Sequence, residues 1–512
     1  MGSLKLVICE KPSMAQSISA VLNAKKRREG FFEGEHWLVS WCYGHLVELA
    51  PADAYGEQYK RWSYDTLPIL PDVWQYRASE GKKKQFDILR SLMKRKDVKS
   101  IVCATDAGRE GELIFRLVYE QATCDKDVQR LWISSLEDSA IRDGFNKLRP
   151  SSDFDSLYHA ALCRAKADYL IGINATRLFS SLYGLTLNVG RVQSPTLALI
   201  VNREVAINEF VSEPFYTPEI NCGDFIVLGD KTKSAEEAEA IRSETNGKNA
   251  VVVSVEKQKK TTAPPRLYDL TSLQRDANRL LGFTAQQTLD YVQSLYEKKL
   301  CSYPRTDSRY ITSDMAKGIP ALAQAVAGAL PFYNGDKPTV NALFIVKDSA
   351  VSDHHAIIPT ATMASTDLSS LPNEERNILF MIANQLLCAV SIKHSYEVVK
   401  VVLGCAGYGF TAKGKTVLID GWKAIDSAFK ASLKIKSTSK DEATEDAESN
   451  ATLPELTKNQ AFKSVSASVK EGKTSPPARY SEDIRYKGGK RKPPKISWQR
   501  LIRSRLKRFS SI

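Results

Sequence analysis

The first 150 residues alternate short apolar runs with amphipathic stretches. "LKLVICE", residues 4–10, and "VKSIVCATD", residues 98–106, are typical of buried strands. Each is followed by a helical pattern, "PSMAQSISAVL" after the first and "GELIFRLVYEQ" after the second, and Pro12 suits a first helical turn. Repeated strand, turn and helix predict an α/β domain built on a parallel sheet.

Beyond residue 150, the predicted secondary structure changes between helix and strand several times. Residues 155–211 carry helical periodicity, and helical patterns return from Tyr268 to Tyr296, where Gly282 is a predicted helix end. Residues 214–260 and 395–422 read as strands. We predict that these two strand-rich segments pair in one sheet and that the mainly helical insertion between them projects as a unit.

These changes predict an α/β, multidomain protein with six segments. They are a sheet domain at 1–152, a first helical part at 153–213, a first strand-rich part at 214–265, a helical insertion at 266–394, a strand-rich return with a charged loop (433–452) at 395–480, and a basic tail at 481–512.

Composition narrows the cellular setting. No apolar run approaches the roughly 18 residues of a membrane helix, and the N-terminus lacks a signal-peptide pattern, which favours a cytosolic or organellar interior. The nine cysteines form no CxxC pair, so a zinc ribbon is not expected. The net charge of +13 falls to +2 without residues 485–512, so any nucleic-acid site in the body of the chain must be local.

Acidic side chains follow both predicted strands. Glu10 ends the first strand and Asp106 follows the second, with Glu110 and Glu112 just beyond. Ligands of open parallel sheets lie beyond the carboxyl ends of the strands, and converging carboxylates suit Mg²⁺. Alternatively, Glu110 and Glu112 only favour the positive start of the following helix.

Three further stretches carry candidate chemistry, each with a structural alternative. "CSYPRTDSRYIT" places Tyr303 near Arg305, either as a packed strand aromatic or as a nucleophile beside a phosphate clamp. "NVGRVQSPT", residues 188–196, is either a phosphate grip or a turn and helix cap. "VSDHHAIIPT" offers His354 and His355 for phosphate binding or for the core.

Five stretches together resemble the type IA DNA topoisomerases, and the bacterial topoisomerase III branch matches best. They are "LVICEKPSMA", "ATDAGREGELI", "NVGRVQSPTLA", "SYPRTDSRYI" and "HHAIIPT", in the family's order and spacing over about residues 1 to 480. The resemblance implies a Toprim-type parallel sheet domain (1–152) followed by a torus. In that torus a helical gate domain (266–394), which bears the tyrosine, is inserted in a strand-rich arch.

The same resemblance implies roles for individual residues. Tyr303 would be the nucleophile that forms a 5′-phosphotyrosine, and Arg305 would hold the scissile phosphate. Lys11 or Glu10 would supply a proton to the leaving 3′ oxygen. His354 would contact a phosphate. The expected magnesium ligands are Glu10, Asp106 and Glu110. The expected groove residues for single-stranded DNA are Trp62, Tyr169, Arg177, Asn188, Val189, Gly190, Arg191, Val192 and Gln193, together with Arg305.

The implied function is an ATP-independent topoisomerase that cleaves one strand, passes another and religates, relaxing or decatenating DNA. The expected setting is the nucleoid of a bacterial cytoplasm, with single-stranded or negatively supercoiled DNA bound by a monomer, without zinc or membrane. The alternative is a truncated, non-catalytic single-strand-binding remnant.

Two departures bear on this choice. Gly108 stands where the family often has a second aspartate, which predicts weaker metal binding. Residues 481–512 leave the family pattern, as a basic DNA-binding tail or, as we expect, an out-of-frame truncation.

Overall fold

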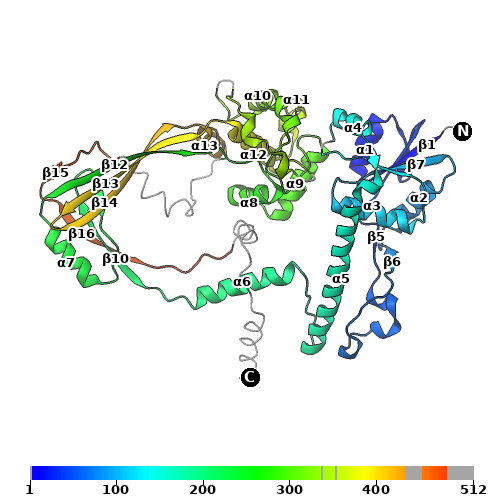
Figure 1. Ribbon diagram of the computed structural model, residues 1–512, viewed down its shortest axis with the longest axis horizontal. Helices are drawn as coiled ribbons and strands as arrows, with labels where there is room; N and C mark the ends of the chain where they lie inside the picture. Colours follow the sequence, from blue (N-terminus) through cyan, green and yellow to red (C-terminus); the bar gives the residue numbers. More distant parts are fainter. Residues whose placement is uncertain (1–2, 135, 336–337, 352–353, 434–452, 481–512) are drawn as a thin grey trace. The chain divides into compact units, whose positions relative to one another are not determined.

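A computed structural model describes residues 3–134, 136–335, 338–351, 354–433 and 453–480 (Figure 1). The chain divides into two compact units, each assembled from separate stretches. Unit 1 contains Met1–Ile200, Leu289–Thr312 and Lys347–Leu379, and unit 2 contains Val201–Thr288, Ser313–Val346 and Phe380–Ile512. The predicted basic tail, and the predicted charged loop apart from Leu433, lie outside the described residues.

Unit 1 is built on a seven-stranded sheet in the order β2-β3-β4-β1-β7-β8-β9. Its strands are β1 (Leu4–Cys9), β2 (Lys26–Arg28), β3 (Phe31–Glu33), β4 (Trp37–Trp41), β7 (Val98–Ala104), β8 (Val128–Arg130) and β9 (Arg149–Pro150). The two predicted strands, β1 and β7, pair in parallel, as do β1 with β4 and β7 with β8. The parallel sheet is therefore confirmed, and antiparallel strands extend it at both edges.

Helices and loops surround this sheet. Those of unit 1 are α1 (Pro12–Val21), α2 (Lys83–Met93), α3 (Arg109–Gln121), α4 (Asp138–Phe145), α5 (Asp155–Tyr183) and α11 (Thr362–Ser365), with a small sheet of β5 (Val47–Leu49) and β6 (Tyr76–Ala78). The apolar faces of β1, β7, α2 and α3 form the core, with Leu6, Leu89 and Phe115 fully buried. Burial of such side chains stabilises the sheet by about 1.5–3 kcal/mol each.

Unit 2 contains a second sheet, in the order β15-β12-β13-β14-β11-β10-β16 (Figure 1). Its strands are β10 (Pro214–Asn221), β11 (Ile226–Leu228), β12 (Ala250–Thr262), β13 (His394–Cys405), β14 (Tyr408–Ile419), β15 (Ala461–Phe462) and β16 (Ser466–Lys473). Because β12 pairs along its length with β13, the predicted union of the two strand-rich segments is confirmed.

The helices of unit 2 are α7 (Ala235–Thr245), α8 (Leu270–Leu281), α10 (Ile319–Ala329) and α13 (Trp422–Ser432). Three helices continue along the chain from one unit to the other, α6 (Gln193–Asn208), α9 (Ala285–Glu297) and α12 (Asn373–Val390). Helix α8 ends at Gly282, as predicted, because the glycine adopts a left-handed conformation with φ of 72°.

The division into compact units cuts across the predicted insertion at 266–394. Residues 289–312, which include Tyr303, group with unit 1, because their contacts are with the sheet domain and with residues 354–360. The bounds of the six predicted segments stay a prediction. In the part of the chain that the structure describes, no helix is long and apolar enough to cross a membrane.

Candidate active site

Two carboxylates meet at the carboxyl ends of β1 and β7, as the sequence predicts. The backbone N–H of Asp106 donates to Oε2 of Glu10 at 3.2 Å. Glu10 is only 4% exposed. Burial, and then the neighbouring Asp106 carboxylate, raise the pKa of Glu10 from its ordinary value of 4.5 to about 7, although Lys11 acts in the opposite direction. Glu10 can therefore hold a proton near neutral pH.

Tyr303 lies directly against this pair. Its hydroxyl donates to Oδ2 of Asp106 at 2.7 Å, and its ring packs edge-on against Tyr296, 5.3 Å away between centroids. The side chain is 6% exposed. Burial and the adjacent Asp106 carboxylate raise the pKa of the Tyr303 phenol well above its ordinary value. The tyrosine is thus held as a neutral phenol, with a base in hydrogen-bond contact.

His354 completes the arrangement from another segment. Its ring lies 4.3 Å from the Tyr303 ring, and its Nδ1 is 2.9 Å from Oγ of Ser134. The backbone carbonyl of Ser134 also accepts from the Tyr303 N–H at 3.3 Å. Burial lowers the pKa of His354 to about 4, so the ring is neutral at pH 7. If Ser134 donates to Nδ1, the proton lies on Nε2, which is buried without a hydrogen-bond partner.

The tyrosine segment is held by hydrogen bonds to the histidine segment. Ser302 Oγ donates to the Ala356 carbonyl at 3.0 Å and accepts from the Ile358 N–H at 3.0 Å. Thr306 Oγ1 donates to the carbonyl of His354 at 2.9 Å. Because these bonds flank Tyr303 on both sides, its backbone is placed by the same segment that carries the histidine.

A buried ion pair lies against the loop that carries Asp106. Arg130 and Glu112 are both fully buried, and Arg130 Nε donates to Glu112 Oε1 at 2.5 Å. The guanidinium also donates to the backbone carbonyls of Asp106 at 2.7 Å, Thr105 at 2.8 Å and Leu131 at 2.7 Å. Arg130 therefore joins the loop that carries Asp106 to the segment that leads to Ser134. Glu112, predicted to lie near the rim, instead points into the core.

The three expected magnesium ligands are not gathered together. Glu110 is about half exposed, forms an ion pair with Arg164 and lies 3.5 Å from Nε2 of His45, whose pKa is lowered by burial. Among the residues that the structure describes, no group of three or more His, Cys, Asp or Glu side chains is placed to hold a metal ion. Glu10 and Asp106 do fit a hard cation, since their carboxyl groups converge at one edge of the sheet and carboxylate oxygens are its preferred ligands.

A cavity of about 520 Å³, with several charged side chains in its lining, opens beside the carboxylate pair. Its lining includes Glu10, Lys11, His45, Glu110 and Arg305. Arg305 is exposed, in contrast to the buried Tyr303, so its guanidinium is available to an incoming anion. The two predicted basic residues, Lys11 and Arg305, therefore share one cavity with the predicted general acid, where they could face a phosphodiester.

Three predicted groove residues lie on or against α5. The guanidinium of Arg177 lies 5.4 Å from the Trp62 ring and donates to the Tyr59 carbonyl at 2.7 Å. Trp62 is 47% exposed, which leaves its indole open to a base. Tyr169 packs against Trp74, and burial raises its pKa to about 12. Its hydroxyl is buried without a hydrogen-bond partner.

Several polar groups of the loop at 188–193 already bond to other residues of the protein. Arg191 forms a two-pronged ion pair with Asp168, with N···O distances of 2.7 and 3.1 Å. The N–H of Val189 donates to Thr176 Oγ1, and that of Gly190 donates to Ser194 Oγ. The turn-and-cap alternative therefore describes this loop well, and Arg191 would have to leave Asp168 to hold a phosphate. Asn188 and Val192 lie in the same turn, and Gln193 begins α6.

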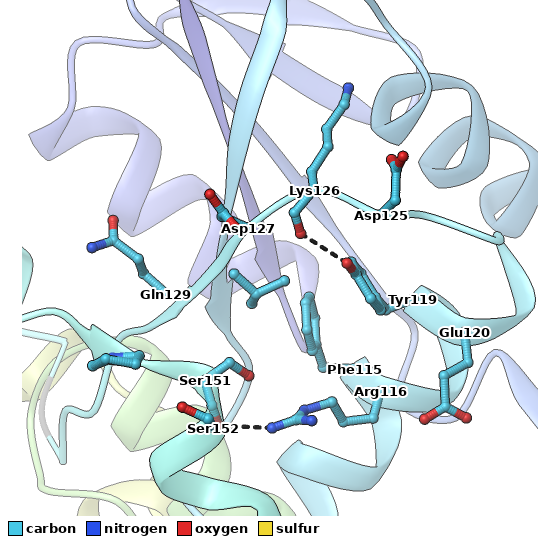
Figure 2. Close-up of a pocket in the computed structure, with 12 residues that line it drawn as sticks. Phe115, Arg116, Tyr119, Glu120, Asp125, Lys126, Asp127, Gln129, Ser151 and Ser152 are labelled. Carbon is cyan, nitrogen blue, oxygen red and sulfur yellow. Dashed lines mark hydrogen bonds between the residues drawn. The ribbon is translucent and has the colours of Figure 1, made fainter.

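A larger cavity, of about 570 Å³, lies near the start of β8 (Figure 2). Within it the Tyr119 hydroxyl donates to the Lys126 carbonyl at 2.8 Å, and Arg116 donates to the Ser151 carbonyl at 2.7 Å. It contains none of the predicted site residues, and its charges are mixed. Size alone therefore does not identify the site.

Sequence reasoning missed several supporting residues. Four residues that contact the site lie in no recognised motif. Each contributes through a contact with a residue elsewhere in the sequence; they are Ser134, Arg130, Tyr296 and His45. A signal was available for Arg130 alone, since a charged side chain inside a buried strand requires a buried partner.

Comparisons with known proteins agree with this geometry. Residues 5–136 match the family described as Toprim domain, and residues 152–484 match the family described as DNA topoisomerase. The first match assigns the carboxylate-bearing sheet to the Toprim class. The chain belongs to the type IA DNA topoisomerase family, which confirms the resemblance carried by the five motifs.

The chain is 40% identical to DNA topoisomerase 3 of Bacillus licheniformis, over 94% of this chain and 66% of that protein. It is 39% identical to DNA topoisomerase 3 of Bacillus subtilis, with the same coverage. The chain thus spans just under two thirds of the length of these relatives. Full-length topoisomerase I from Thermotoga maritima shares the fold, with a TM-score of 0.69 and 22% identity, over 94% of this chain and 74% of that chain.

Proposed function

We propose that this protein is an ATP-independent type IA DNA topoisomerase that cleaves one DNA strand with Tyr303, passes a strand through the break and religates it. The observation that carries the proposal is the 2.7 Å hydrogen bond from the Tyr303 hydroxyl to Asp106, beside a buried Glu10. A packed strand aromatic would need neither a carboxylate partner nor a cavity with basic residues beside it.

The proposed cleavage step uses three groups of the chain. Oη of Tyr303 bonds to phosphorus and its proton passes to Asp106, which already accepts its hydrogen bond. The bond from phosphorus to the 3′ oxygen breaks, and that oxygen takes a proton from Glu10. With a pKa of about 7, Glu10 is matched to this task at neutral pH, so we favour it over Lys11.

Two further groups would stabilise the charge on the phosphate. Arg305, exposed at the cavity, would pair with a nonbridging oxygen, and the unpartnered Nε2 of His354 would donate to another. Religation reverses the step, as the 3′ hydroxyl attacks the phosphotyrosine. Because the phosphotyrosine conserves the energy of the broken bond, no nucleotide is consumed.

Mg²⁺ is the proposed cofactor, held by Asp106 and by the oxygen of Glu10 that does not carry the proton. When bound, it would offset the negative charge of DNA phosphates near the site. Glu110 would join these ligands only by giving up Arg164 and His45, and Gly108 supplies no carboxylate. We therefore expect weak binding of the ion.

The proposed substrate is single-stranded or negatively supercoiled DNA, bound by a monomer in the nucleoid of a bacterial cytoplasm. Trp62 and Arg177 would contact the single strand. The alternative, a non-catalytic single-strand-binding remnant, shares this groove but forms no covalent bond to DNA.

Covalent capture of DNA distinguishes the proposed topoisomerase from the non-catalytic remnant. Wild-type protein, mixed with a labelled single-stranded oligonucleotide and quenched with denaturant, should carry the label. Tyr303→Phe should abolish the adduct and leave oligonucleotide affinity within about twofold, since only the attacking oxygen is lost. Tyr296→Phe is the matched control, because this neighbouring tyrosine should be dispensable for the adduct. A labelled adduct in Tyr303→Phe, or none in the wild type, would reject the proposed chemistry.

A further inference from the structure

One face of the sheet in unit 2 concentrates basic side chains. Lys260 on β12, Lys400 on β13, and Lys413 and Lys415 on β14 border a hollow of about 290 Å³. Glu256 is the one acidic side chain in its lining. The strand register explains the gathering, since Glu256, Lys400 and Lys413 form one row across the three strands.

Glu256 stands directly opposite Lys400 and offsets only part of the charge of these four lysines. In the described part of the chain, none of the four makes an ion pair with a carboxylate. Lys260, Lys400 and Lys413 are exposed, and Lys415 lies over the Tyr396 ring, with its Nζ 4.4 Å from the centroid. Lys400 and Lys413 stand directly opposite each other, which is destabilising for like charges.

The opposite face of the same strands is arranged differently. There Lys259 stands opposite Glu397, and Lys257 stands opposite the apolar Val399. Lysines commonly protect exposed sheet edges, which accounts for basic residues on β12 and at the end of β14. Edge protection does not account for Lys400, because β13 is paired on both sides. The repulsion between Lys400 and Lys413 would be relieved by a polyanion.

We infer that this face is a second DNA-binding surface, which holds the phosphate backbone of a duplex segment without reading its sequence. The inference rests on the proposed function for the choice of DNA as the polyanion. Duplex is favoured over single-stranded DNA because the lining has one aromatic ring, Tyr396, and Lys415 covers it. Binders of single strands use open aromatic rings to stack the bases.

Paired charge-removing variants test the inference. Lys400→Gln with Lys413→Gln removes two charges from this face, and Lys257→Gln with Lys259→Gln removes two from the other. Affinity for a labelled duplex is measured by fluorescence anisotropy over a range of salt concentrations. The first variant should flatten the slope of log affinity against log salt by about 2, and the control by clearly less. Thermal unfolding of both variants verifies their folding.

The outcomes separate this inference from the proposed function. Equal slopes for the two variants would overturn the basic face as a DNA surface, and a loss confined to single-stranded DNA would overturn the choice of duplex. Covalent capture of a short oligonucleotide by Tyr303 should be unchanged in the Lys400→Gln, Lys413→Gln variant. If the wild type forms no adduct, the proposed function fails, whereas the salt slopes still decide whether this face binds DNA.

Discussion

At the scale of single residues, the ionisation of the Glu10 carboxyl should make the stability of the protein depend on pH. Its pKa is raised from 4.5 to about 7, so the folded protein retains a proton that the unfolded chain has lost. The contribution of Glu10 to stability is therefore complete below about pH 4.5. It is lost progressively as pH rises to about 7, where the buried charge must form beside Asp106.

We predict that Glu10→Gln removes this pH dependence. Relative to the wild type, the variant should gain on the order of 3 kcal/mol of unfolding free energy between pH 4.5 and pH 8, because the amide never ionises. Denaturant unfolding in EDTA at both pH values measures the difference. Parallel behaviour of the two proteins would mean that Glu10 ionises normally in the folded state.

Burial also keeps His354 neutral, but it does so by lowering the pKa of the ring. A neutral ring can still donate from Nε2, so its proposed role needs a hydrogen bond and not a positive charge. His354→Gln should therefore retain more cleavage activity than His354→Leu, which we expect to lose about 10- to 100-fold. Single-turnover capture of an oligonucleotide compares them. Equal losses would argue that the ring acts through packing against Tyr303.

At the scale of elements, the start of α3 decides where Asp106 lies. Gly111 lies so close to the preceding turn that an added Cβ would stand 2.0 Å from the Asp106 carbonyl oxygen. The same oxygen accepts from Arg130. The helix can therefore begin beneath the strand end only because residue 111 lacks a side chain.

Gly111→Ala should displace Asp106 and destabilise the protein by about 2 kcal/mol or more, with loss of covalent capture. Gly108→Ala is the matched control in the same turn, because its Cβ would meet nothing within 4 Å and its φ of 174° is extended backbone. Thermal unfolding and adduct yield compare the two variants. A tolerated Gly111→Ala would show that the turn can shift without affecting the site.

At the scale of the whole molecule, the proposed DNA affinity would have to come from local surfaces. The net charge of +13 includes eleven basic residues between positions 485 and 512, and the remainder is close to neutral. The cavity beside Tyr303 and the lysine face of the second sheet are two such surfaces. The first places Lys11 and Arg305 beside the proposed nucleophile, and the second gathers four lysines around a hollow.

The proposed mechanism also predicts what the whole reaction requires. Negatively supercoiled plasmid should relax in Mg²⁺ without nucleotide, because the phosphotyrosine stores the energy needed for religation. Gel analysis of topoisomers over time should show no acceleration by ATP, and EDTA should suppress relaxation. A requirement for ATP would contradict the mechanism.

The sequence by itself determined the family, the parallel core of the first sheet and the union of the two strand-rich segments. It also predicted that Glu10 and Asp106 meet at one edge of the first sheet, whereas the role of Tyr303 stays a prediction. These features follow from local patterns, because hydrophobic periodicity and motif spacing can be read directly from the amino-acid sequence. Hydrophobic runs specify buried strands, and the carboxyl ends of parallel strands bring their acids to one edge.

Only the tertiary structure decided which of these residues meet. Glu110 and Glu112 lie two positions apart in one motif, yet one pairs with Arg164 and His45 at the surface and the other with Arg130 in the core. Likewise, Ser134 and His354 are 220 positions apart and share a hydrogen bond. Side-chain direction and long-range pairing depend on how elements pack, and no local pattern in one chain records that.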